Sequence, residues 1–141
     1  MKLIIAIVSS LFFLSAFAQN IPECKNARGE VVPDSRDYLQ SVARAGGARP
    51  QVLVSGVVRN VLPEDHTGSP HQKFVIEYDG IELSIVSNLD FGRIPVKIGD
   101  AVRICGEYLN VGQGMVHWTH HDPAGRHPNG FTVHEGVIYG M

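Results

Sequence analysis

Histidine is concentrated in one part of this sequence. The chain has 141 residues and seven His, and five of these His fall within 18 residues. They are His117, His120, His121, His127 and His134, with Asp122 among them. Imidazole nitrogens and carboxylate oxygens are ligands that Zn²⁺ and Cu²⁺ accept in proteins. The segment is therefore a candidate metal site.

A metal site here requires the chain to turn within the histidine segment. If one extended strand ran through it, His117 and His121 would stand about 13 Å apart, at about 3.3 Å per residue. That separation is too large for two ligands of one ion. Asp122-Pro123 and Gly125 favour a reversal, because Pro lacks a backbone N–H and Gly adopts tight turns readily.

One earlier histidine extends the candidate ligand set. His71 lies just ahead of a predicted strand that we expect to neighbour the strand containing His117. At least three side chains are then expected to reach one ion at about 2.0 to 2.2 Å, as Zn²⁺ requires. The candidate ligands are His71, His117, His120, His121 and Asp122. The surrounding loop is expected to be shaped by Pro123, Gly125, His127 and Gly130.

The same residues have a purely structural interpretation. His and Asp side chains often bond to loop backbone, and they would then fix the turn from Asp122 to Gly130 without binding an ion. His66 is expected in a solvated loop, and His134 at a strand or tail position with no special role. The sequence leaves both interpretations of the cluster open.

A metal-dependent hydrolase, acting on nucleic acid or phosphoesters, is the alternative function. HNH-type nucleases use one His to activate water and another to hold a divalent cation, and His120-His121-Asp122-Pro123 offers those residue types. That motif needs a helix for its last His, whereas Gly125, Pro128 and Gly130 are helix breakers. The chain has no Gly-x-Ser-x-Gly elbow and no phosphate-binding Gly loop. The sequence therefore favours binding over catalysis.

Residues 1–18 have the features of a secretory signal peptide. Lys2 provides a positive start, an apolar run extends from Leu3 to Leu14, and Ala16-Phe17-Ala18 matches the small-x-small cleavage pattern. A membrane anchor would need about 20 apolar residues. We therefore expect cleavage after Ala18, export to the periplasm or the exterior, and no transmembrane segment in the mature chain.

An exported chain with two Cys most simply forms one disulfide. The pair is Cys24 and Cys105, and a bridge between them would close most of the domain into one loop. The expected stabilisation is at most about 4 kcal/mol. Neither Cys has a CxxC partner, so redox catalysis is disfavoured. Two unpaired thiols are the alternative.

The elements that must position these side chains are mostly strands. In the N-terminal segment, residues 19–50, apolar positions recur at helical spacing from Tyr38 to Ala45 and stop at Gly46-Gly47, which predicts a short helix. Beyond Pro50 the pattern is typical of strands and turns. Strands are expected over Gln51–Leu62, Lys73–Tyr78, Ile81–Asn88, Ala101–Leu109 and Met115–Thr119, with a turn at Asp79-Gly80 and a further hairpin offered by Phe131 to Tyr139.

Five strands, one helix and no βαβ rhythm predict a mainly β fold. We expect residues 51–141 to form a small five-stranded OB-like antiparallel barrel with a His-rich C-terminal loop, preceded by the short N-terminal helix. The alternation of apolar positions selects the buried face of each strand. The expected core residues are Val54, Val58, Phe74, Ile76, Leu83, Ile85, Val102, Ile104, Val116 and Trp118.

Several motifs resemble a known bacterial family. They are His71-Gln72-Lys73-Phe74, Gly99-Asp100-x-Val102 with Gly106-Glu107-Tyr108, and His117 to Pro123 followed by Gly125, His127 and Gly130. Together they are similar to the domain-of-unknown-function family 3465, over about Val52 to Tyr139, and the string from His117 to Pro123 is the most specific part. The resemblance implies a small exported β-domain of Gram-negative bacteria with no established activity. The family more often has Trp where this chain has Phe131, a departure without mechanistic consequence.

Charge limits the partners of this chain. Twelve Lys and Arg against fourteen Asp and Glu give a net charge of −2, so the broad basic surface that drives nonspecific nucleic-acid binding is missing. The sequence therefore predicts an exported binding module for an unknown small ligand or a divalent metal, with Zn²⁺ or Cu²⁺ as the cofactor that the cluster suits. An envelope protein-interaction module is the second alternative.

Overall fold

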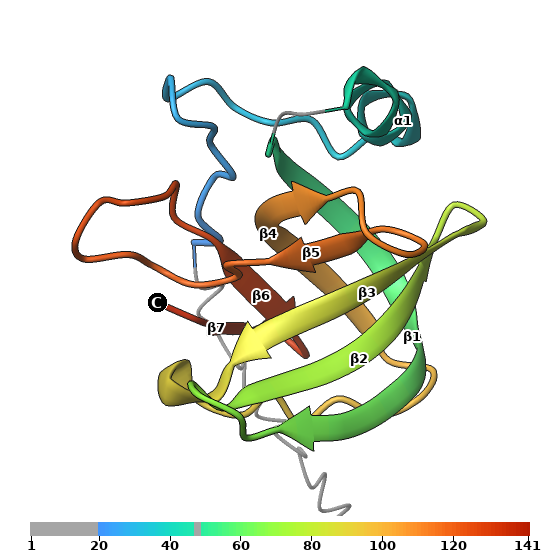
Figure 1. Cartoon of the computed structure of the whole chain (residues 1–141), viewed down its shortest axis with the longest axis vertical. Coiled ribbons are helices and arrows are strands. Elements are labelled where there is room, and N and C mark those ends of the chain that lie inside the picture. The colour runs from blue at the N-terminus through green and yellow to red at the C-terminus, as the bar shows by residue number, and fades with distance from the viewer. Residues whose placement is uncertain (1–19, 47–48) are drawn as a thin grey trace, which may run out of the picture.

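The computed structural model describes residues 20–46 and 49–141, and it is mainly β, with seven strands and one α-helix in that part of the chain (Figure 1). The expected signal peptide, residues 1–18, lies outside the described residues. Within the described ranges, no helix has the length and apolar character needed to cross a membrane.

The helix α1 (Arg36–Ala45) forms where the apolar spacing predicts it. Ser35 precedes it, and the Ser35 side chain accepts a hydrogen bond from the backbone N–H of Tyr38, which satisfies one of the free donors of the first turn. Leu39 is buried and joins the main core. The helix therefore covers one end of the strands, as Figure 1 shows.

Seven strands form one sheet whose pairings close into a ring. The strands are β1 (Gln51–Asp65), β2 (His71–Tyr78), β3 (Ile81–Asn88), β4 (Ala101–Leu109), β5 (Met115–His117), β6 (Phe131–His134) and β7 (Val137–Tyr139), and a 3-10 turn η1 (Leu89–Phe91) follows β3. The order is β1-β2-β3-β5-β4-β6-β7, and β1 also pairs with β4. All pairs are antiparallel except β3 with β5, which is parallel.

The strand β4 has two partners on the edge that faces away from β1. Its residues 107–109 pair with β5, and its residues 102–105 pair with β6. Gly106 lies between the two pairings, and a Cβ atom there would stand 2.5 Å from the carbonyl oxygen of His117. Only glycine allows this approach. The end of β5 and the start of β6 are therefore adjacent along β4, and the loop that connects them begins and ends beside Gly106.

Two hairpins turn on the same backbone geometry. Asp79 and Gly80 join β2 to β3 with φ angles of 47° and 78°, and Glu135 and Gly136 join β6 to β7 with φ angles of 48° and 77°. Two consecutive residues with positive φ are typical of the type I′ turn, whose twist matches that of paired strands. Both hairpins agree with the sequence pattern.

The core confirms nine of the ten expected residues. They are Val54, Val58, Phe74, Ile76, Leu83, Ile85, Val102, Ile104 and Val116, each at most 4% exposed. The tenth expectation, Trp118, is wrong: this residue is only half-buried and lies outside the core cluster. Strand parity placed it beside Val116, but β5 ends at His117, so the alternation does not continue.

A disulfide joins the N-terminal segment to the sheet, as expected. Cys24 and Cys105 are bridged with their Cα atoms 5.6 Å apart and a sequence separation of 81. Both side chains are buried with Val32, Leu53 and Phe131 in a second apolar cluster. The bridge therefore fixes the segment before α1 against β1, β4 and β6.

Replacing both cysteines tests this bridge. We expect Cys24→Ser with Cys105→Ser to lower the free energy of unfolding by up to about 4 kcal/mol, because the loop that the bridge closes is long. Denaturant unfolding of the purified variant against the wild type measures the loss. Mass spectrometry of wild-type protein prepared without reductant checks the premise, and two free thiols would contradict it.

Candidate functional site

The candidate site begins where β5 stops. The backbone of Trp118 has φ of 50°, in the left-handed region that residues other than glycine rarely adopt. This reversal ends β5 at His117, two residues before the expected end of the strand at Thr119, and it provides the turn that a metal site in the histidine segment requires. It also turns Thr119 inward, where its side chain is 1% exposed and its hydroxyl donates to the Ser87 hydroxyl at 3.3 Å.

Two glycines let the chain after Trp118 pass close to neighbouring backbone. A Cβ at Gly130 would stand 2.2 Å from the carbonyl oxygen of Trp118, and a Cβ at Gly140 would stand 2.4 Å from that of Thr119. The N–H of Gly130 donates to the carbonyl of His120 at 2.9 Å, and the N–H of His121 donates to the carbonyl of Gly140. The segment 118–121 is therefore held on both sides.

The carboxylate of Asp122 organises the loop from Asp122 to Gly130. It is 5% exposed and accepts hydrogen bonds from the backbone N–H groups of Ala124 at 3.0 Å, Arg126 at 2.6 Å and His127 at 3.2 Å. Burial by itself would raise the pKa of Asp122, but the N–H groups of Arg126 and Ala124 outweigh it and bring the pKa to about 2. The charged Asp122 side chain thus stabilises the conformation of the loop by accepting hydrogen bonds from its backbone.

Asn129 closes the other end of this loop. Its side-chain oxygen accepts from the backbone N–H of Asp122 at 3.0 Å and from Nδ1 of His121 at 3.1 Å. The structural interpretation of the sequence, in which side chains bond to the loop backbone, therefore describes Asp122 well. Residues 122–130 form turns and irregular chain rather than a helix, so they lack the helix that an HNH-type motif needs.

Five aromatic rings pack in a continuous array beside this loop. Phe91 stacks on His120 with ring centres 4.1 Å apart, and His120 meets His127 edge-on at 5.0 Å. Trp118 stacks on His127 at 4.4 Å and on His117 at 4.7 Å. Trp118 is therefore held between two imidazoles instead of in the core.

The array borders a pocket of about 480 Å³. All five expected ligands line it: His71, His117, His120, His121 and Asp122. Ser69 lies just before β2, Asn88 ends β3 and Phe91 ends η1, whereas Pro123, Arg126 and His127 come from the loop between β5 and β6. Figure 1 shows these segments at one end of the sheet. Residues far apart in sequence therefore share one cavity, in a size range usual for small-molecule sites.

Hydrogen bonds fix which imidazole nitrogens carry protons. Nδ1 of His120 donates to the carbonyl of His121 at 2.8 Å, and Nδ1 of His121 donates to Asn129. Nε2 of His117 donates to the Glu107 carboxylate at 2.9 Å. Burial lowers the pKa of His120, which favours the neutral ring. In neutral rings, His120 and His121 thus keep Nε2 as an acceptor or ligand atom.

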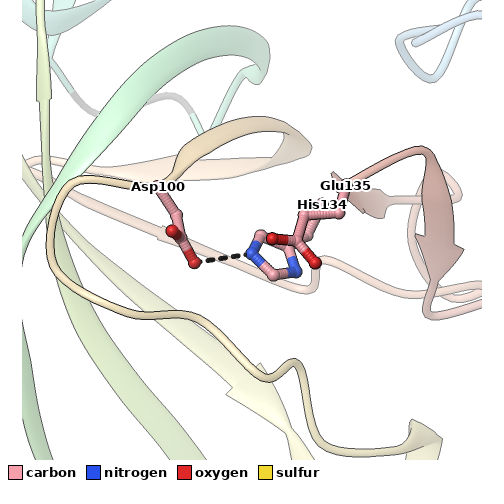
Figure 2. Close-up of side chains that lie close together, drawn as sticks. All are labelled: Asp100, His134 and Glu135. Carbon is pink, nitrogen blue, oxygen red and sulfur yellow. Dashed lines mark hydrogen bonds and ion pairs between the residues drawn. The ribbon is translucent and has the colours of Figure 1, made fainter.

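The five expected ligands share a pocket without meeting at one point. In the described residues, the only group of three or more His, Cys, Asp and Glu with ligand atoms within 4.8 Å of one another is Asp100, His134 and Glu135. Nε2 of His134 donates to the Asp100 carboxylate at 2.7 Å (Figure 2). His134 lies at a strand position, as expected, but its contact with Asp100, 34 positions earlier in the chain, was not expected from the sequence. In the sequence, only the Gly99-Asp100 turn and the alternation in β6 pointed to this contact between His134 and Asp100.

One family comparison gives a match. Residues 30–140 match the model of a family described as "Protein of unknown function (DUF3465)". The search of curated proteins and the search of solved structures give no match.

The role of the Asp122 carboxylate is testable by acid. Its pKa of about 2 lies below the ordinary 3.8, so its stabilising charge is present above pH 3.8 and is lost as the pH falls through about 2. We expect Asp122→Asn to be less stable than the wild type at neutral pH and to lose less stability over this acid range. Thermal melts of both proteins between pH 5 and 2 measure the difference, and parallel curves would contradict it.

Proposed function

The chain belongs to the family of unknown function DUF3465, and we propose that it is a small exported binding module whose ligand occupies the pocket lined by His71, Trp118, His120 and His121. The five-ring array carries this proposal. Among the described residues, Phe91 and His117 each stack on only one ring, so a planar ligand can stack on their second faces, while imidazole nitrogens and Arg126 give it hydrogen-bonding partners. A small planar organic molecule with polar substituents suits such a site best.

Export to the periplasm or the exterior is part of the proposal. The disulfide between Cys24 and Cys105 supports it, because such bridges persist in oxidising compartments. The leader pattern in residues 1–18 supports it independently. The resemblance to a family of Gram-negative bacteria makes the periplasm the preferred compartment.

The ring of strands supports an OB-like barrel as the scaffold. Five strands pair in the order β1-β2-β3-β5-β4, with β4 returning to β1, and the main core lies on their inner faces. A ring of this kind leaves few unpaired edges. The binding pocket then lies where β5 and the ends of β2 and β3 meet.

Trp118 makes the proposal directly measurable, since it is the one Trp in the chain. We expect adenine, nicotinamide or benzoate to change its fluorescence on binding, and glucose, which is not planar, to have no effect. His120→Ala should weaken the binding of a positive probe about fivefold, because one aromatic pair contributes about 1 kcal/mol.

The matched control for this experiment is His66→Ala. His66 is exposed and does not line the pocket. We expect this variant to bind the probes like the wild type. The proposal fails if none of the planar probes changes the fluorescence, or if His120→Ala and His66→Ala bind them equally.

A divalent metal is the second candidate ligand, and the tautomers favour it. In the neutral rings, Nε2 of His120 and Nε2 of His121 each carry a lone pair, and His71 lines the same pocket. Imidazole suits Zn²⁺ and Cu²⁺. Because these nitrogens do not yet meet at one point, binding requires the side chains to rotate around the ion.

Calorimetric titration with Zn²⁺ tests the metal candidate. We expect His71→Ala with His121→Ala to lower the affinity at this site at least about tenfold, since the loss of outer partners alone weakens metal sites 10- to 100-fold. His66→Ala is again the control. Equal heats for the double variant and the wild type would exclude the pocket as a metal site.

A further inference from the structure

A second cluster of ligand-type side chains lies outside the pocket. Asp100 precedes β4, His134 ends β6, and Glu135 begins the turn to β7. One ligand atom from each lies within 4.8 Å of the other two, and Figure 2 shows the His134 ring between the Asp100 carboxylate and the surface turn with Glu135. The pocket lining includes none of the three.

His134 is the unusual member of this cluster. It is 2% exposed, and Nε2 donates to Asp100 Oδ2 at 2.7 Å. The other nitrogen, Nδ1, is buried and has no hydrogen-bond partner among the described residues. Buried polar atoms in proteins are nearly always paired, so an orphan of this kind calls for an explanation.

The partners of Asp100 decide which nitrogen is free. Asp100 Oδ2 also accepts from the backbone N–H of Lys97 at 2.8 Å. Because a carboxylate oxygen that accepts from the Lys97 N–H is also the partner of His134 at 2.7 Å, the imidazole donates to it from Nε2. Nδ1 of the neutral ring then presents a lone pair.

We propose that His134 and Glu135 bind one divalent transition-metal ion of the Zn²⁺ type, through Nδ1 and the carboxylate, with Asp100 orienting the imidazole from its other side. Histidines that bind metals commonly donate their second ring N–H to a carboxylate, and Asp100 already occupies that position. Water completes the coordination, because two protein ligands leave positions open.

The surroundings allow the ion to enter from the surface. Glu135 is exposed, and it lies in a two-residue turn with Gly136. Entry of an ion requires this turn to move away from the Nδ1 side of His134 while the contact of Nε2 with Asp100 is kept. The competing explanation is a buried water, because Thr132 Oγ1, two residues earlier in β6, is the other buried side-chain atom without a partner in the described part of the chain.

Side-chain ¹H–¹⁵N spectra of the mature protein during a Zn²⁺ titration test this site. We expect the Nδ1 resonance of His134 to shift while the Nε2 proton to Asp100 persists. Glu135→Gln removes the charged ligand from an exposed position and should weaken this response more than tenfold. Glu82→Gln, which makes the same change at an exposed position of β3, should leave it unaltered.

The same spectra separate this site from the pocket. A Zn²⁺ response confined to His71, His120 and His121 would support the pocket and overturn the proposal for His134. A His134 response that is equal in wild type and Glu135→Gln also overturns it, as does no response of His134 at all, which leaves the buried water as the explanation. In His71→Ala with His121→Ala, the His134 response should remain, whatever the outcome for the pocket.

Discussion

The left-handed backbone of Trp118 is the constraint on which the functional end of this protein depends. It stops β5 after three residues, so that β5 covers only part of one edge of β4. The rest of that edge is taken by β6, and the intervening chain must leave the sheet as a loop. Such a conformation is unfavourable for a Trp by itself, and the surrounding contacts must stabilise it.

Those contacts come from small residues and from ring stacking. Gly106, Gly130 and Gly140 allow backbone to approach the segment 117–120 at distances that any side chain would block. On the other side, Trp118 lies between His117 and His127. The reversed backbone is therefore supported from both faces, and the rings that support it also line the pocket that we propose for ligand binding.

Polar side chains have two roles around the loop from Asp122 to Gly130. Asp122 and Asn129 satisfy backbone N–H groups, and in doing so they fix the shape of the loop. His120 and His121 each donate a hydrogen bond through Nδ1, to a backbone or a side-chain oxygen, and this leaves Nε2 available for a ligand. Structural and ligand-binding roles are thus compatible in the same side chains, because an imidazole has two nitrogens.

The sequence by itself determined the helix, the disulfide partners, nine core residues and the approximate bounds of most strands, because alternation, capping residues and a single Cys pair are local or countable signals. It also located five of the residues that line the pocket. The tertiary structure decided that Trp118 leaves the core and that His134 pairs with Asp100. A positive φ at a Trp and a contact across 34 residues depend on neighbours that only the folded chain brings together, and no periodicity in the sequence records them.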